Sequence, residues 1–270
     1  MRLTVKQLQA LIKQGELIAA TELAMQLLRD DPANADVRAV YIELLCIQGA
    51  LEKADQQLDM MVRQHPDFLV GAVNLRQLIR AASARHDFYN GGMTATLFGE
   101  PDAMFEALLS LRLALKEQDT DAAVKAANTL ESLRGNVALD INGETVTDVR
   151  DLDDSLAGYL ELFGTDGQYY LAKFSEIDSL QLKKPESLLD TVWRRAEIVI
   201  KDGPQGEVFV PVTYVDSLKV SERLGKDTNW QQHHEQLVTG AGQKMLLVGE
   251  EALTLTEVRQ LSLSDSAVTA

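Results

Sequence analysis

The sequence predicts an α+β protein in which tandem helix pairs come first and a mostly antiparallel β half follows. Two observations support this fold class. Residues from Gly15 to Pro66 repeat with a fixed period and carry apolar residues at helical spacing, whereas short apolar runs separated by turn residues begin after residue 136. We therefore expect a helical domain over residues 1–135 and a β-rich domain with one or two helices over residues 136–270.

The internal repeat consists of four pairs of identical residues, and the members of each pair are 34 positions apart. The pairs are Gly15 with Gly49, Leu17 with Leu51, Ala20 with Ala54, and Pro32 with Pro66. This is the period of the tetratricopeptide repeat, in which two antiparallel helices form one unit. Such units bury their apolar faces by stacking, and the concave face of the stack suits a peptide or a helix. In the alternative interpretation, these few repeats only pack against the β half.

Apolar stripes at helical spacing define the expected helices. The stripes cover residues 8–12, 17–28, 37–45, 51–62, 69–79, 104–115 and 122–133. Gly15 and Gly49 are expected to end helices, because glycine tolerates a left-handed backbone, whereas Pro101 opens a helix and Gly135 ends the last one. Residues 81–99 have no clear period, so we expect a connection or an irregular helix and loop there.

Short runs of β-branched, aromatic and other apolar residues define the expected strands. The runs cover residues 137–141, 145–149, 156–163, 169–174, 196–200, 207–215, 245–249 and 253–263. Residues 156–163 could also form a helix, but the turn at residues 164–167 and the strand after it favour a hairpin. Asn142-Gly143 is the strongest hairpin signal, because both residues accept the positive φ of a type I′ turn. A short helix is expected from Glu186 to about Trp193, and a loop is expected over residues 225–234.

Composition and charge narrow the class of function. The chain has 270 residues and a net charge of −15, with a pI of about 4.7. Nucleic acid is not expected as a partner, because phosphate contacts need clustered Lys and Arg. Cys46 is the single cysteine, so an internal disulfide is impossible, and its apolar neighbours indicate a packed thiol. No apolar run has the length of a membrane span, and we expect the first 14 residues to form an amphipathic helix, not a signal peptide.

Four aspartates form a candidate site for a divalent cation, since carboxylate oxygens are the ligands that hard cations prefer. They are Asp148, Asp151, Asp153 and Asp154. The segment lacks the glycine and the distal glutamate of an EF-hand loop. We therefore expect a solvated loop between strands, in which Asp153 caps a turn.

Glycines and histidines near the C-terminus are further candidates for chemistry. Gly240-x-Gly242 could contact a phosphate, but a strand follows where phosphate motifs need a helix, so a turn is expected. His233-His234 could ligate zinc, but a zinc site needs three or four ligands, and the other two histidines lie in the helical half. No Gly-x-Ser-x-Gly elbow occurs in the sequence. The sequence therefore predicts no catalytic, cofactor-binding or metal-binding residue.

The aromatic residues favour structural roles. Trp193 and Trp230 are the only tryptophans of the sequence, and large aromatics usually pack in a core, so we expect both in the core. The alternative is that they anchor a partner. Tyr169 and Tyr170 alternate on an expected strand, so one should face inward and the other outward.

An ordered set of short motifs in the second half carries a resemblance to a known family. The motifs are Asp151-x-Asp153-Asp154, Gly167-x-Tyr169-Tyr170, Pro185-x-x-Leu188-Leu189-Asp190-x-x-Trp193-Arg194, Pro211-x-x-Tyr214, Leu224-Gly225-x-x-Thr228-x-Trp230 and Gly240-x-Gly242-Gln243. In this order they resemble the ImpE family, also called TagJ or SciE, whose members are accessory proteins of bacterial type VI secretion. The resemblance covers nearly the whole chain, including the helical half.

This resemblance implies a cytoplasmic, non-enzymatic protein without a cofactor. Family members associate with the N-terminal helix of the small sheath subunit and are linked to the AAA+ ATPase that recycles contracted sheath. The resemblance supplies no binding motif, so partner-binding residues stay unassigned. Two alternatives remain. One is a tetratricopeptide-like scaffold for another secretion component, such as the ATPase itself, and the other is an enzyme with a pocket of Asp153, Asp154, His233 and His234.

Overall fold

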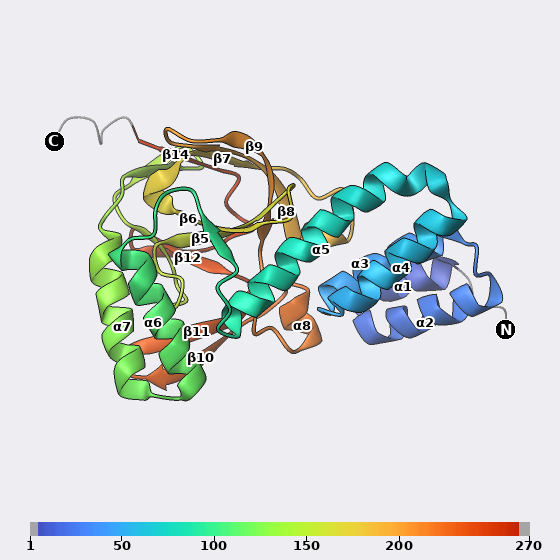
Figure 1. The fold of residues 1–270 in the computed structure, drawn as a ribbon, viewed down its shortest axis with the longest axis horizontal. Coiled ribbons are helices and arrows are strands. Elements are labelled where there is room, and N and C mark those ends of the chain that lie inside the picture. Colours follow the sequence, from blue (N-terminus) through green and yellow to red (C-terminus); the bar gives the residue numbers. More distant parts are fainter. Residues whose placement is uncertain (1–4, 265–270) are drawn as a thin grey trace.

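The computed structural model describes residues 5–264, in which a helical lobe and a β lobe lie side by side (Figure 1). The helices of the first half are α1 (Val5–Gln14), α2 (Leu17–Asp30), α3 (Ala35–Ile47), α4 (Leu51–Gln64), the 3-10 turn η1 (Pro66–Phe68), α5 (Leu69–Tyr89), α6 (Ala103–Glu117) and α7 (Thr120–Arg134). From α1 to α5 each helix packs on the next, and α6 packs on α7. The expected stack of helix pairs is therefore confirmed for α1 to α5, whereas the α6–α7 pair lies against the β lobe, apart from that stack (Figure 1).

Local chemistry explains where these helices begin and end. Gly15 and Gly49 adopt φ angles of 80° and 73°, which lets the chain reverse between the helices of a pair. The side chains of Asn34, Asp102 and Asp119 each accept the backbone N–H three residues ahead, at 3.0–3.1 Å. These bonds satisfy donors that the first turn of a helix would otherwise leave unpaired.

Residues 81–99 differ from the prediction. Helix α5 continues to Tyr89, because residues such as Ala82 and Phe88 are buried and the Phe88 ring stacks on Phe105 with centroids 6.4 Å apart. After it, the strand β1 (Ala95–Leu97) pairs in parallel with a strand of the β half. Three residues are too short for a periodic pattern, so the sequence does not predict that the helical half supplies a strand.

The β half forms one large sheet and two small ones. Its strands are β2 (Leu139–Ile141), β3 (Glu144–Val146), β4 (Val149–Asp151), β5 (Tyr159–Gly164), β6 (Tyr169–Lys173), β7 (Ile177–Leu182), β8 (Trp193–Ile200), β9 (Gln205–Pro211), β10 (Thr228–His234), β11 (Leu237–Gly242), β12 (Met245–Val248), β13 (Glu251–Thr254) and β14 (Gln260–Leu263). Within residues 5–264 the large sheet has the order β1-β6-β5-β9-β8-β7-β14-β2-β3, and the small sheets are β10-β11 and β13-β12-β4. Apart from β1–β6, the pairs are antiparallel, which confirms the predicted class.

The expected hairpins β2–β3, β5–β6 and β8–β9 are confirmed. Asn142 and Gly143 have φ angles of 54° and 93°, as a type I′ turn requires. Strand β7 is not predicted, because it has only two fully buried positions among its six residues. The strand expected over residues 253–263 is two strands, β13 and β14, since Glu257 accepts the Thr254 N–H at 2.8 Å and turns the chain.

Two further predictions for the β half are wrong. In place of the helix expected from Glu186 to about Trp193, the described residues 186–192 contain only the 3-10 turn η3 (Leu189–Thr191), because Trp193 already pairs with Pro211 as the first residue of β8. The loop expected over residues 225–234 contains strand β10, which follows the short helix α8 (Val220–Arg223).

The buried apolar residues form two clusters on opposite faces of the large sheet, and β5 shows the division. Tyr159 and Phe163 belong to the cluster that continues into the helices, whereas Leu160 and Leu162 belong to the cluster on the other face. Glu161 shares the helix-covered face with Tyr159 and Phe163 and is fully buried. Because the first cluster joins both halves, the domain boundary at residue 135 stays a prediction. No helix in residues 5–264 is long and apolar enough to cross a membrane.

Candidate partner-binding surface

The chain itself covers the face of α1 and α3 that turns toward the β half. A gap of only about 10 Å³ separates the two halves there, and it is lined by Ile12, Gly15, Leu17, Leu44, Leu188 and Leu224. The backbone N–H of Leu189 donates to Glu43 Oε2 at 3.3 Å. A partner would have to displace these loops to reach this face. The alternative interpretation, in which the repeats pack against the β half, therefore holds for this part of the stack.

Side chains hold the two covering loops in place. In the loop before β8, Asp190 Oδ2 accepts the backbone N–H of Glu186 at 2.9 Å. In the loop before β10, Glu222 Oε2 accepts the backbone N–H of Lys219 at 3.0 Å. Each carboxylate fixes a turn, and each turn presents one leucine to the helices. The motifs that contain Leu188-Leu189-Asp190 and Leu224-Gly225 thus join the two halves.

An open groove lies between α1 and α2. Its volume is about 430 Å³, and it is lined by Gln7, Ala10, Leu11, Ala19, Glu22, Leu23 and Gln26. Ala10 and Leu11 stand one period before Leu44 and Leu45, which are buried inside the stack. Ala10 is exposed and Leu11 is half-buried. Within residues 5–264 the same repeat positions are therefore closed in the second helix pair and open in the first.

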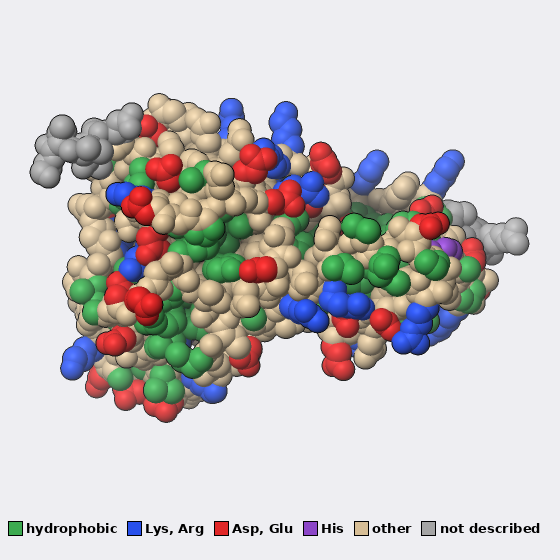
Figure 2. Space-filling model, turned by 45° about the horizontal axis from the view of Figure 1, so that its top comes forward, with side chains coloured by type: hydrophobic (Ala, Val, Ile, Leu, Met, Phe, Trp, Pro, Cys, Tyr) green, Lys and Arg blue, Asp and Glu red, His purple; other side chains and the backbone are tan. Residues whose placement is uncertain are grey.

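A second apolar surface lies at the start of α5. Leu69, Val70 and Val73 share one face of this helix and are 53%, 74% and 46% exposed. Apolar side chains are visible on the helical lobe in Figure 2. A helix packed at this position would bury the face, as α4 buries the neighbouring one.

Buried charges join α5 to the β half. Arg85 on α5 donates through Nε and Nη2 to the two carboxylate oxygens of Glu161, at 2.7 and 2.6 Å. Lys244 Nζ lies 2.5 Å from Glu161 and 3.6 Å from Asp151. The Tyr169 hydroxyl also donates to Glu161, at 2.7 Å. Glu161 therefore has several donors and two cationic neighbours, which a carboxylate inside a core requires.

The same contacts set the pKa values of the Glu161 and Asp151 carboxyl groups. Burial alone would raise the pKa of Glu161, but the charges and hydrogen bonds of Arg85 and Lys244 outweigh it and hold that pKa far below its usual range. Burial raises the pKa of Asp151 to about 6, although Lys244 and the hydroxyl of Tyr214 at 2.7 Å oppose the shift. Glu161 thus stays ionised, whereas Asp151 titrates in mildly acidic solution.

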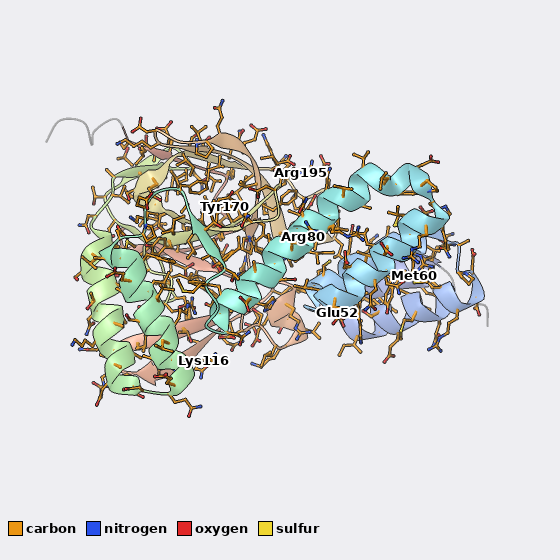
Figure 3. All side chains as sticks on the ribbon, viewed as in Figure 1. Glu52, Met60, Arg80, Lys116, Tyr170 and Arg195 are labelled. Carbon is orange, nitrogen blue, oxygen red and sulfur yellow. The ribbon has the colours of Figure 1, made fainter. Side chains whose placement is uncertain are left out.

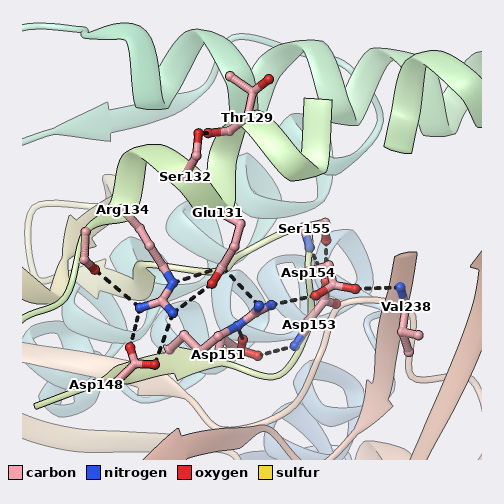
Figure 4. Close-up of polar contacts among 12 residues, drawn as sticks. Thr129, Glu131, Ser132, Arg134, Asp148, Asp151, Asp153, Asp154, Ser155 and Val238 are labelled. Carbon is pink, nitrogen blue, oxygen red and sulfur yellow. Dashed lines mark hydrogen bonds and ion pairs between the residues drawn. The ribbon is translucent and has the colours of Figure 1, made fainter. Parts of the chain in front are cut away.

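The four candidate aspartates do not form a solvated loop. Asp148 accepts two hydrogen bonds from Arg134, and Asp154 accepts one from Arg150 at 2.6 Å (Figure 4). Glu131 on α7 binds both arginines. These contacts tie the end of α7 to the segment around β4.

Asp151 and Asp153 are fully buried, so the prediction of a solvated loop is wrong for them. Asp153 Oδ1 accepts the Ser155 N–H at 2.8 Å, as a turn-capping aspartate does, and Oδ2 accepts the Gly240 N–H at 2.9 Å. Sequence spacing alone could not show this, because Gly240 follows Asp153 by 87 positions.

The histidines, the aspartates and the glycines occupy the β10–β11 region without forming one site. His233 lies on β10 and contacts the Thr239 hydroxyl at 2.9 Å, whereas Asp153 and Asp154 bind backbone N–H groups of β11. Among residues 5–264 no group of three or more His, Cys, Asp or Glu is placed to hold a metal ion. The Asp/His pocket of the enzyme alternative is therefore not assembled as a ligand set.

Gly240 lies inside strand β11, so the prediction of a turn is wrong for it, whereas Gly242 is the last residue of that strand. A Cβ on Gly240 would collide with the ring of Tyr214, and one on Gly242 would collide with the backbone oxygen of Asp227. The two glycines therefore allow close packing of chain segments, which is a common use of glycine in a strand.

The aromatic residues and the cysteine divide between core and surface. Trp193 is buried and packs edge-on against Phe163 with centroids 5.4 Å apart, as expected, but Trp230 is 42% exposed, so the core prediction is wrong for it. Tyr169 faces inward, whereas Tyr170, labelled in Figure 3, is only half-buried and donates to Asp166. The packed thiol of Cys46 is confirmed, and burial raises its pKa.

Comparisons with known proteins agree with this architecture. The model of the family described as ImpE protein matches residues 143–262, and that of a tetratricopeptide repeat matches residues 11–75. The type VI secretion system accessory component TagJ of Pseudomonas aeruginosa is 24% identical over 262 residues, which cover 94% of this chain and 89% of that protein. The crystal structure of a Vibrio parahaemolyticus protein is also similar, with 37% sequence identity and a TM-score of 0.92. The superposition covers 96% of this chain and 98% of that protein.

Proposed function

Because this chain belongs to the ImpE/TagJ family, we propose that it is a cytoplasmic, non-enzymatic accessory protein of type VI secretion that acts by binding another protein. In this proposal its partner is the N-terminal helix of the small contractile-sheath subunit, and it is linked to sheath recycling by the AAA+ ATPase. The observation that carries the proposal is the groove between α1 and α2, because it is an open apolar surface of the repeat stack.

The groove has the composition that an amphipathic helix needs. Ala10 and Ala19 are small, so a helix backbone can approach closely, and the half-buried Leu11 offers apolar area. Glu22 and Gln26 supply polar partners at its edges, which fix the register of the bound helix. Burial of apolar area contributes about 25 cal/mol per Å², but the loss of free motion on association offsets much of this gain.

Copurification tests the partner, and a substitution tests the groove. We expect the protein to retain the full-length sheath subunit and to lose a subunit that lacks its first helix. Ala10→Arg should weaken binding about tenfold or more by placing a charge against the apolar face of the helix. Ala122→Arg is the matched control, because Ala122 is an exposed alanine on α7, remote from the groove in sequence and in its helix pair. Equal retention of the truncated subunit would exclude this binding mode.

A second candidate function is a scaffold that binds the ATPase directly. The exposed face of Leu69, Val70 and Val73 favours it, because this surface lies on a different helix from the groove and could take a separate partner. Pull-downs with the ATPase and the sheath subunit separately distinguish the two functions. Capture of the ATPase alone, abolished by Val70→Asp and kept by Ala10→Arg, would support the scaffold.

A further inference from the structure

A cavity of about 300 Å³ lies where α3 and α5 meet the β half. Its lining includes Arg85, His86, Phe163, Trp193, Asp216 and Arg223. This volume is at the lower end of the range for small-molecule sites. The cavity is separate from the α1–α2 groove, since the two share no lining residue.

Guanidinium groups that line the cavity have donors without a protein partner. Arg85 is only 5% exposed, and its Nε and Nη2 are bound to Glu161 and to the carbonyl oxygen of Thr213. Nη1 of Arg85 makes no hydrogen bond to any residue that the structure describes. Arg223 donates from Nε to the Ser217 carbonyl oxygen at 3.1 Å, and in the same described range its two terminal nitrogens have no bonded partner. These nitrogens can donate to an anionic acceptor in the cavity.

The rest of the cavity lining is apolar on one side, and it carries little negative charge that would repel an anion. Phe163 and Trp193 meet edge to face at 89° and form an aromatic wall. Among the described residues that line the cavity, Asp216 is the one acidic side chain, against two arginines. Burial and the neighbouring charge of Arg85 lower the pKa of His86, so its imidazole is mostly neutral and can also donate a hydrogen bond.

We propose that this cavity binds a small carboxylate with an apolar body. The free donors of Arg85 and Arg223 take the carboxylate, and the wall of Phe163 and Trp193 takes the apolar part. The carboxylate can belong to a free organic acid or to the C-terminal residue of a peptide, because both present the same group. This site is independent of the partner named under Proposed function, so either can fail without the other.

Tryptophan fluorescence tests the proposal in full-length protein. In a Trp230→Phe background Trp193 is the single tryptophan, and we would titrate phenylacetate, its neutral analogue phenylacetamide, and Gly-Gly-Phe with a free or an amidated C-terminus. Saturable binding of an acid about tenfold tighter than its amide is the expected result. Preference for phenylacetate or for the free tripeptide then identifies the source of the carboxylate.

Variants assign the binding to the cavity. Arg223→Gln should weaken the acids about tenfold and leave the amides unchanged, since it removes a charged donor. Arg80→Gln is the matched control, because Arg80 lies on α5 outside the lining. His86→Ala is a second cavity variant, and the circular dichroism melt of each variant reports whether it folds. Equal affinity for acid and amide, or no saturable change with any probe, would overturn the proposal.

Discussion

The helix pairs have an inner face, which turns toward the β half, and an outer face, which carries the groove between α1 and α2. The two faces differ in what covers them. On the inner face, Leu188 and Leu224 fill the space against α1 and α3, and the Arg85–Glu161 pair fixes α5 to the sheet. On the outer face, the groove between α1 and α2 has apolar residues and no cover within residues 5–264. One face of the same repeat therefore holds the molecule together, and the other carries the surface that we propose for the partner.

This difference also explains why a stack of so few repeats is stable. Tetratricopeptide-like units are stabilised by their neighbours, and a short array has few of them. Here the β half takes the place of further repeats on the inner face. The buried ion pair adds little net free energy, because the loss of hydration offsets much of the attraction, but it penalises any arrangement that leaves one charge unpaired.

The largest effect is expected from breaking this buried pair. Glu161→Ala leaves Arg85 and Lys244 without their shared carboxylate inside the core. We expect the free energy of unfolding to fall by about 3–5 kcal/mol, measured by urea denaturation. Arg63→Ala is the control, since it removes a surface pair with Asp59 and should change stability little. A small effect of Glu161→Ala would show that this ion pair does not hold the two halves together.

A smaller effect on stability is expected from a substitution in the loops that cover the inner face. Leu224→Ala removes packing against the helices and should lower the free energy of unfolding by about 2 kcal/mol. Because the proposed helix site is on the outer face, affinity for the sheath subunit should stay within about twofold, measured by calorimetry. A clear gain in affinity would contradict the comparison, since it would mean that the loop competes with the partner for the inner face.

The sequence predicts the parts of this comparison that rest on local patterns. Helical spacing and turn glycines inside each 34-residue unit predict the helix pairs, and Asn142-Gly143 predicts a hairpin, because these signals act within a few residues. The closing of the inner face depends on contacts between distant segments, such as Arg85 with Glu161, which are 76 positions apart. A single charged residue in an apolar run indicates burial only when its partner is known. The groove is likewise not visible in the sequence, because the stripe of α1 looks the same whether or not a neighbour covers it.

The pH dependence of stability sharpens the account of the junction, and its expected effect is about as large as that of Leu224→Ala. The pKa of Asp151 is raised to about 6 in the folded protein, so its ionisation disfavours folding. Its contribution to stability is fully present below the ordinary pKa of an aspartate and is lost as pH rises through about 6. The pKa of Glu161 is lowered, so its contribution is present above the ordinary value of a glutamate and stays constant over this window.

Asp151→Asn isolates the effect of Asp151 ionisation on stability, because asparagine cannot ionise and has a similar shape. We expect wild-type protein to lose about 2 kcal/mol relative to the variant between about pH 4.5 and about pH 7, measured by urea denaturation at each pH. The Tyr214 hydroxyl can still donate to the remaining side-chain oxygen of the amide, so the hydrogen bond to this residue is not the source of the difference. If the two proteins lose stability in parallel, Asp151 is already ionised and fully compensated by Lys244, and the junction carries two ion pairs in place of one.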